Sequence, residues 1–144
     1  TEVFPNAEPE IRVHIVYALS QINDIIAVPF LMDQFAGQIP VVRAAIALAL
    51  GKLRDARALP TLINGVKDYD EIVRANALYA LSSFYTPNVV DTLINSLDDP
   101  VQRVREAAGE ALTQLTGLKL GPNKQAWLSW WQQQKQAMTK DSKS

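Results

Sequence analysis

The chain has 144 residues, nearly half of them apolar, and its 14 basic and 15 acidic side chains leave a net charge of −1. This composition excludes a largely disordered chain, and the charge balance argues against a nucleic-acid binder, which usually carries a basic stripe. The absence of cysteine excludes disulfides, thiolate metal sites and cysteine nucleophiles. No apolar run reaches the roughly 18 residues of a membrane-spanning helix, so no membrane insertion is expected.

Four kinds of position recur along the chain at one fixed interval. They are an arginine, an alanine, a leucine and a further apolar residue. The series are Arg12, Arg43, Arg74 and Arg105; Ala18, Ala49, Ala80 and Ala111; Leu19, Leu50, Leu81 and Leu112; and Ile22, Leu53, Phe84 and Leu115, so the period is 31 in every series. A fixed period between about 20 and 50 residues is typical of stacked repeat proteins. We therefore expect a single all-α solenoid of about four two-helix units.

Each unit is predicted to hold two helices, because apolar residues recur at steps of three and four. Asp24 and Asp55 are placed to cap the second helix of the first two units, and Thr86 with Pro87 takes this place in the third. The expected helices span 10–22, 26–36, 40–53, 57–67, 71–84, 88–97, a stretch from Pro100 to Leu115, and 123–138. The expected boundaries are an N-terminal loop over 1–9, one solenoid over 10–138 with units 10–38, 39–69, 70–99 and 100–138, and a disordered tail over 139–144.

The fourth unit departs from the pattern after Leu115. A loop with two glycines leads to the last helix, which holds all three tryptophans of the chain, Trp127, Trp130 and Trp131. One interpretation is an end cap, in which the rings cover the core of the final repeat and polar residues face outward. The other is a tryptophan-lined binding surface.

The arginine series is expected to bind the turns between units. Arg74 and Arg105 each follow a turn aspartate by six residues and can fold back onto it, whereas Arg43 can reach forward to Asp68. Charge-assisted hydrogen bonds would then tie the turns together. Anion binding is the alternative, although no glycine-rich phosphate-binding loop accompanies these arginines.

The segment from Val42 to Leu62 combines Val-Arg, Ala-Leu-Gly, an aspartate and a proline in an order that resembles HEAT-like repeats of the phycobilisome-lyase type. The resemblance covers about 10–115, and the tryptophan-rich end is similar to that of bacterial HEAT-repeat proteins. It implies a right-handed superhelix of antiparallel helix pairs, with the first helix of each unit on the convex face and the second on the concave face. It also implies a scaffold or protein-binding role.

Catalysis is not expected. Similar families include deoxyhypusine hydroxylases, which hold two irons with His-Glu pairs, but the single histidine of this chain, His14, is followed by Ile15. HEAT-like DNA glycosylases use a basic concave surface, which the charge pattern does not provide. We expect no enzyme, no cofactor and no metal. The alternatives to a scaffold are an accessory protein of lyase or chaperone type acting on a client chromoprotein, and a structural fragment of a longer solenoid.

If the second helices line a groove, their outward residues form rows with the same period. The expected partner-binding residues are Phe30, Thr61 and Thr92 in one row and Asp33, Asn64 and Asn95 in the next. An asparagine amide both donates and accepts hydrogen bonds, so such a row suits a protein or an extended peptide. The alternative is that these are ordinary solvent-facing residues.

The first helix is apolar on nearly all sides, because Val13, Val16 and Tyr17 lie outside its expected core face. Such a helix is normally buried. Either a preceding repeat covers it, or it forms an interface for self-association or for a partner.

Overall fold

The computed structural model describes residues 4, 7–22, 24 and 26–143, and every regular element in them is helical. The α-helices in chain order are α1 (Pro9–Gln21), α2 (Ala27–Phe35), α3 (Pro40–Leu53), α4 (Leu59–Gly65), α5 (Glu71–Leu81), α6 (Pro87–Asn95), α7 (Gln102–Thr116) and α8 (Lys124–Lys143). Two short 3-10 helices, η2 (Ala56–Ala58) and η3 (Ser96–Asp98), adjoin α4 and α6. The predicted all-α solenoid is therefore confirmed.

Short polar side chains precede α2, η2 and α6, at the places where the sequence analysis expects helix caps. Asp24 accepts a hydrogen bond from the backbone N–H of Ile26, and Asp55 accepts one from that of Arg57, each at 2.9 Å. Thr86 accepts one from Val89. Thr86 is therefore the N-cap of α6, and Asp55 is the N-cap of η2, which leads into α4. The N-cap of α2 is Ile26, which forms no side-chain capping bond, so Asp24 stabilises the turn that precedes this helix. Of the predicted loop over 1–9, residues 1–3, 5 and 6 lie outside the described residues.

The last helix is longer than the sequence analysis expects. That analysis ends it at Met138 and predicts disorder over 139–144, whereas α8 continues to Lys143. No glycine or proline follows Pro122, and the glutamines, lysines and alanines of this segment favour helix. The structure thus places residues 139–143 in α8, where the sequence analysis expects a disordered tail, and Ser144 lies outside the described residues.

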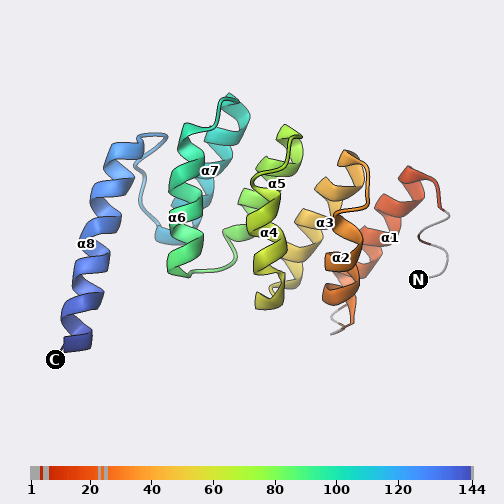
Figure 1. Ribbon diagram of the computed structural model, residues 1–144, viewed down its shortest axis with the longest axis horizontal. Coiled ribbons are helices and arrows are strands. Elements are labelled where there is room, and N and C mark those ends of the chain that lie inside the picture. The colour runs from red at the N-terminus through yellow and green to blue at the C-terminus, as the bar shows by residue number, and fades with distance from the viewer. Residues whose placement is uncertain (1–3, 5–6, 23, 25, 144) are drawn as a thin grey trace.

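The helices form two layers (Figure 1). In the first layer α1, α3, α5 and α7 stack side by side, each in contact with the next. In the second layer α2 packs against α3, α4 against α5 and α6 against α7, and α8 packs against α6 at the C-terminal end. Each closely packed pair thus consists of a second-layer helix and the first-layer helix that follows it.

This pairing is offset by one helix from the predicted units 10–38, 39–69, 70–99 and 100–138. Within each predicted unit, as between α1 and α2 or between α3 and α4, the helices make fewer contacts than they make across the predicted boundary. The turns at those boundaries are held by the arginine series, described below, so they are the interior of a pair. Among the described residues, no α-helix precedes α1 as its partner.

The two layers also differ in how closely their helices approach one another. Neighbouring first-layer helices contact along their lengths, whereas contacts between neighbouring second-layer helices are sparse. The first-layer helices therefore pack against one another more closely than the second-layer helices do. We call the surface of the first-layer helices that faces away from the second layer the inner face, and the surface of the second-layer helices that faces away from the first layer the outer face.

The close approach of first-layer helices depends on small residues. A Cβ atom added to Gly51 of α3 would lie 2.6 Å from the Cα atom of Ala80 in α5, closer than side-chain carbons approach backbone atoms. Ala49 and Ala111 are buried like Ala80. Ala18, the first of this series, is exposed because no described α-helix covers that side of α1.

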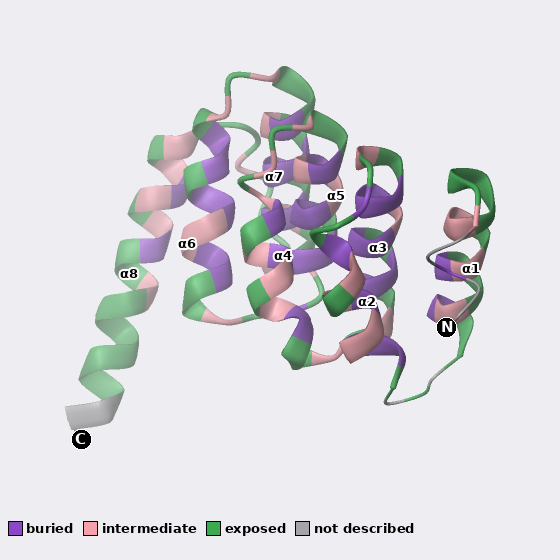
Figure 2. Cartoon of the chain, turned by 45° about the vertical axis from the view of Figure 1, so that its right-hand side comes forward, coloured by how far each residue is buried: buried purple, intermediate pink, exposed green. Residues whose placement is uncertain are grey.

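The core lies between the two layers and runs through the stack (Figure 2). The leucine series contributes Leu50, Leu81 and Leu112, all with no exposed surface. At the C-terminal end the core continues into Trp127 and Trp131 of α8. Full burial of such a side chain is worth about 1.5–3 kcal/mol, so the stack is stabilised only where neighbouring pairs cover it.

Candidate functional site

The arginine series joins the turns that lead into successive first-layer helices. Arg43 donates two hydrogen bonds to Asp68, from Nε to Oδ2 at 2.8 Å and from Nη2 to Oδ1 at 2.9 Å. Arg74 pairs with Asp99 in the same way, at 2.9 and 3.1 Å, and its Nη1 also donates to the carbonyl oxygen of Asp68. Each guanidinium therefore binds its own turn and the next one. The forward contact of Arg43 is the one that the sequence predicts.

The two end members of the series bind backbone and amide oxygens. Arg12 donates to the carbonyl oxygen of Ala7 and to the side-chain oxygen of Gln38, at 2.8 and 2.9 Å. Arg105 donates to the carbonyl oxygen of Asp99 at 2.8 Å. The series thus closes every described turn of this kind with the same backbone contact.

The pairing of Arg43 with Asp68 shifts the pKa of both groups. Burial alone raises the pKa of Asp68, but the hydrogen bonds from Arg43 and from the backbone N–H of Asp70 outweigh it and hold the pKa below its usual value. The bond to Asp68 likewise raises the pKa of Arg43. Because their charges are already paired, Arg43 and Arg74 support the interpretation of a structural ladder over that of anion binding.

The three tryptophans of α8 pack against the core or against one another. Trp127 and Trp131 are buried, and their indole N–H groups donate to the carbonyl oxygen of Gly121 at 2.8 Å and to the carboxylate of Asp91 at 2.7 Å. Trp130 is half-buried and stacks on Trp131 with ring centroids 5.8 Å apart. This burial supports the end-cap interpretation, because only Trp130 presents ring surface to a partner.

The rows predicted on the second-layer helices lie on the outer face as defined above, on α2, α4 and α6. Asp33, Asn64 and Asn95 are exposed, and Phe30, Thr61 and Thr92 are half-buried. The hydroxyl of Thr92 donates within its own helix, to the carbonyl oxygen of Asn88. A hollow of about 430 Å³ between α4 and α6 is lined by Thr92 and Asn95, together with Lys67 and Asn88. The structure therefore brings one part of these rows together but leaves Asp33 and Asn64 outside this hollow.

Phe30 has a specific packing role. Its ring meets that of Phe4 edge to face, with centroids 5.5 Å apart, and Phe4 is almost completely buried. Phe30 is therefore part of the packing that holds the N-terminal segment against α2, rather than a side chain free to contact a partner.

The first-layer helices carry a set of exposed apolar residues that the sequence analysis missed. Tyr17, Leu48 and Tyr79 take the same place in successive repeats, on α1, α3 and α5, with 65%, 50% and 40% of their surface exposed. Val41 and Ile72, one per helix on α3 and α5, add a second row at 56% and 46%. We call these five residues the inner apolar track. The sequence contains one indication of this track, because Tyr17 lies outside the expected core face of its helix.

Shallow grooves accompany the inner apolar track. A hollow of about 310 Å³ between α1 and α3 is lined by Tyr17 and Leu48, with Lys52 at its edge. Another of about 260 Å³ between α3 and α5 is lined by Leu48 and Tyr79. Leu48 lies in both, so it stands at the centre of the track.

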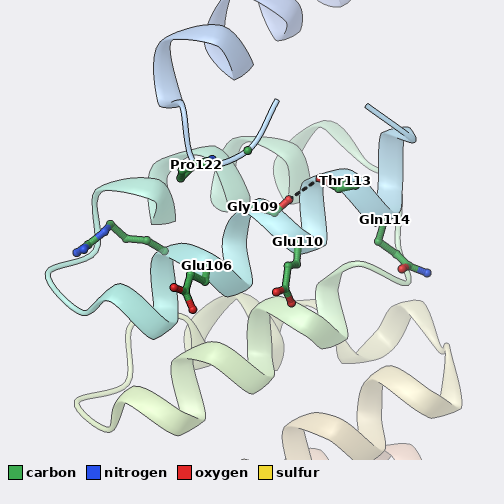
Figure 3. Close-up of a pocket in the computed structure, with 8 residues that line it drawn as sticks. Glu106, Gly109, Glu110, Thr113, Gln114 and Pro122 are labelled. Carbon is green, nitrogen blue, oxygen red and sulfur yellow. Dashed lines mark hydrogen bonds between the residues drawn. The ribbon is translucent and has the colours of Figure 1, made fainter. Parts of the chain in front are cut away.

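A further hollow, of about 580 Å³, lies on α7 at the C-terminal end of the first layer (Figure 3). Glu106, Gly109, Glu110 and Thr113 line it, and the loop that carries Pro122 closes it on one side. In the repeat register, Glu110 takes the place held by Leu48 and Tyr79 on the preceding helices. The apolar track therefore ends in acidic side chains.

Tyr79 and Glu110 connect the track to this acidic end. The phenol of Tyr79 donates to the carboxylate of Glu110 at 2.8 Å. Partial burial, the bond to Glu110 and the negative charge around it raise the pKa of Tyr79 to about 12. The phenol is therefore neutral at physiological pH, and its hydrogen bond to Glu110 fixes the orientation of the ring.

The part of the chain that the structure describes contains no group of three or more His, Asp or Glu side chains arranged to hold a metal ion. Its helices include none with the length and apolar character needed to cross a membrane. His14 is exposed and lines a shallow hollow beside Val41.

Stacked helix pairs with a repeated arginine–aspartate ladder define an α-solenoid repeat protein. A family profile described as HEAT repeats matches residues 28–113, and the chain belongs to this family. The match begins in α2 and ends in α7, so it spans the same three helix pairs that pack most closely. No curated protein matches the chain in sequence. HEAT repeats generally mediate protein–protein interaction and are typically non-catalytic scaffolds.

Proposed function

We propose that this protein is a non-catalytic interaction module that binds a protein partner across the inner apolar track. The observation that carries the proposal is the alignment of Tyr17, Leu48 and Tyr79, exposed on three neighbouring helices that the fold holds side by side. Contiguous exposed apolar surface on a folded domain marks interaction sites more often than scattered apolar residues do.

The size of the track indicates what else the partner must supply. Five side chains, each about half exposed, offer roughly 4–7 kcal/mol of further apolar burial. Association of two proteins costs about 4–15 kcal/mol in lost freedom of motion, so the track alone gives weak binding. Charged contacts at its edges must add to it, from Lys52 on α3 and from Glu106 and Glu110 on α7.

These edge charges also suggest an orientation. A partner that places acidic side chains near Lys52 and basic side chains near Glu106 and Glu110 would match the surface at both ends of the track. Complementary charges of this kind chiefly set the register and the rate of association.

The polar rows on the second-layer helices are the second candidate surface. The hollow between α4 and α6, which Thr92 and Asn95 help to line, favours it at that one place. An extended peptide could there exchange hydrogen bonds with the amide of Asn95. The wider spread of the second-layer helices leaves these rows less continuous than the inner apolar track.

Site-specific photo-crosslinking distinguishes the two surfaces. A benzophenone amino acid is placed at Leu48 on the inner face or, in a matched variant, at Asn64 on the outer face. Irradiation in extracts of the source cells should give a discrete adduct from Leu48 and not from Asn64. An adduct from Asn64 alone would overturn the proposal in favour of the second-layer rows.

The same samples test the alternative roles. An accessory protein of lyase or chaperone type that handles a chromoprotein should yield adducts with visible absorbance from a bilin or similar group. A structural segment of a longer solenoid should yield no discrete adduct from either position.

A further inference from the structure

Arg105 differs from Arg43 and Arg74 in what its guanidinium binds. Arg43 and Arg74 each use Nη1 for a backbone carbonyl of their own turn, and Nε and Nη2 for the two oxygens of one aspartate in the next turn. Arg105 makes the same Nη1 contact, to the carbonyl oxygen of Asp99. Among the described residues, its Nε and Nη2 have no hydrogen-bond acceptor. We call these two donors the forward fork of Arg105.

The repeat register explains why the ladder has no aspartate for this fork. Asp68 and Asp99 stand one repeat period apart, and the next place in this series holds Trp130. The ring of Trp130 lies against those of Trp127 and Trp131, with centroids 5.9 and 5.8 Å away. The chain therefore uses this place for the end cap and not for a third aspartate of the ladder.

The direction of α8 also leads away from the forward fork. Lys124, at the start of α8, pairs with Asp98 in η3, whereas Lys135 pairs with Asp91, nearer the start of α6. The helix α8 therefore runs antiparallel to α6 (Figure 1). Its 20 residues extend roughly 30 Å, away from the turns that the ladder joins. The end of α8 thus lies far from the fork, whereas the end of α6 leads directly into a ladder turn.

The forward fork is accessible, and the preceding rungs define its ligand. Arg105 is half-buried and lines the hollow of about 580 Å³ on α7, and its bond to Asp99 fixes the guanidinium. A guanidinium presents a planar fork that matches the two oxygens of a carboxylate. Arg43 and Arg74 bind an aspartate in this way, at N–O distances of 2.8–3.1 Å. The ligand that fits the forward fork is therefore a carboxylate.

Two glutamates in the same hollow restrict which molecule can carry this carboxylate. Glu106 and Glu110 are exposed, and each accepts a hydrogen bond from a neutral donor, Gln102 and Tyr79 respectively. Their negative charges repel a free acid. A ligand that carries a basic group a few residues from its carboxylate matches both charges, because it pairs with the arginine and with a glutamate.

A segment of this kind already binds the preceding first-layer helix. In the stretch 99–103, Asp99 binds the fork of Arg74, and Arg103 lies 3.6 Å from Glu71. Both Arg74 and Glu71 belong to α5, as Arg105 and the glutamates of the hollow belong to α7. A short polypeptide with an aspartate at one end and a basic residue at the other therefore fits such a surface.

We propose that Arg105 binds an aspartate of a partner protein, whose carboxylate meets the forward fork as Asp68 meets Arg43 and Asp99 meets Arg74. A basic residue close to this aspartate pairs with a glutamate of the same hollow. The site lies outside the five residues of the inner apolar track. Its test reads Arg105 itself, so its failure and that of the proposed function are distinguishable.

The experiment follows the Nε–H groups of the arginines in the full chain by heteronuclear magnetic resonance. Arg43 and Arg74 report the signal of a guanidinium that binds a carboxylate, and Arg54 reports that of an exposed arginine. The probe is an acetylated and amidated peptide of residues 99–104, in which Asp99 is the single acidic residue. It should move the Arg105 signal saturably toward those of Arg43 and Arg74 and leave that of Arg54 unchanged.

A peptide variant and two protein variants locate the contact. The peptide with Asp99→Asn keeps its size but loses the carboxylate, so it should bind at least about tenfold more weakly. In the protein, Arg105→Lys keeps the charge without the fork and should weaken binding by a similar factor, followed on the signals of the peptide. Arg54→Lys is the matched control and should leave binding unaltered. Circular dichroism of each variant separates loss of binding from loss of fold.

Four results would overturn the proposal. An Arg105 signal that coincides with those of Arg43 and Arg74 before peptide is added would show that the chain itself fills the fork. No saturable shift up to about 10 mM peptide, or an equal shift with the Asp99→Asn peptide, would show that the fork does not recognise the aspartate. An equal shift with acetate at the same concentration would assign the fork to free carboxylates instead of a partner protein.

Discussion

Arg43 and Asp68 form a two-point ion pair between successive turns, with both N–O distances below 3 Å and both side chains largely shielded from solvent. The next repeat holds the same pair between Arg74 and Asp99. The pair fixes the turn before α3 to the turn before α5, so it sets the stacking of one helix pair on the next. Stability and curvature of the solenoid therefore depend on a small number of polar contacts as well as on the core.

Asp68→Asn should lower the free energy of unfolding by about 3 kcal/mol, because it leaves the Arg43 guanidinium partly buried without its counter-charge. Urea denaturation followed by circular dichroism measures the change. Asp55→Asn is the matched control, since Asp55 pairs with Arg57 on the exposed surface and asparagine preserves the helix cap. Equal effects of the two substitutions would contradict the role of the ladder.

The same pair predicts the response to acid. The pKa of Asp68 is lowered in the folded state, against about 3.9 when unfolded, so its contribution is present above pH 4 and is lost as the pH falls through the folded value. The difference in unfolding free energy between wild type and Asp68→Asn should thus be largest near pH 5 and shrink toward pH 2. A difference that stays constant over this range would show that the lost stability does not come from the carboxylate charge.

Gly51→Ala should destabilise the fold by about 1–3 kcal/mol, although alanine normally favours a helix over glycine by about 1 kcal/mol. The reason is that the new Cβ would lie 2.6 Å from the Cα atom of Ala80, so α3 and α5 must separate. Gly37→Ala serves as the control, because nothing lies within 4 Å of the Cβ it would introduce. Thermal unfolding of both variants measures the effect, and a Gly51→Ala protein as stable as wild type would refute the close contact.

Tyr79 should titrate near pH 12, whereas an exposed tyrosine titrates near 10. Because the folded state holds this proton more tightly, the stabilising contribution is complete below pH 10 and is lost as the pH rises toward 12. Absorbance of the phenolate at about 295 nm follows the titration, with Tyr79→Phe identifying the signal. Glu110→Gln should bring the value part of the way back toward 10, since burial remains; no change would show that the hydrogen bond is not formed.

The positions of the helices and of the buried leucines could be predicted from the sequence, because both depend on local chemistry. The polar side chains of Asp24, Asp55 and Thr86 and the steps of three and four apolar residues located the helices to within a few residues. The fully buried Leu50, Leu81 and Leu112 follow from the same period. These features are encoded within one or two helical turns, which is why they can be read without a structure.

The pairing of the helices could not be predicted in the same way. The repeat period fixes the distance between equivalent positions but not which of two neighbouring helices belong together. The forward reach of Arg43 to Asp68 was the one sign that the turn between the predicted units is the interior of a pair. The family resemblance placed the second helices on the concave side, and the prediction of partner-binding residues followed from that placement.

The inner apolar track was missed for the same reason. Leu48 and Tyr79 read as ordinary members of an apolar helix, and only their exposure in the fold separates them from the core. Tyr17 alone stood out in the sequence, because its helix is apolar on all sides. The rows of Asn64 and Asn95 were expected to face outward from their helices, but exposure of polar residues carries little information about function.

The central claim is that a partner binds the inner apolar track, and affinity capture with two triple variants tests it most directly. One carries Tyr17→Gln, Leu48→Gln and Tyr79→Gln on the inner face; the other carries Asp33→Ala, Asn64→Ala and Asn95→Ala on the outer face. A protein that the wild type and the outer variant retain and the inner variant loses, at equal helicity, is the result that we predict. A protein that the inner variant retains and the outer variant loses would contradict the account and place the site on the second-layer helices.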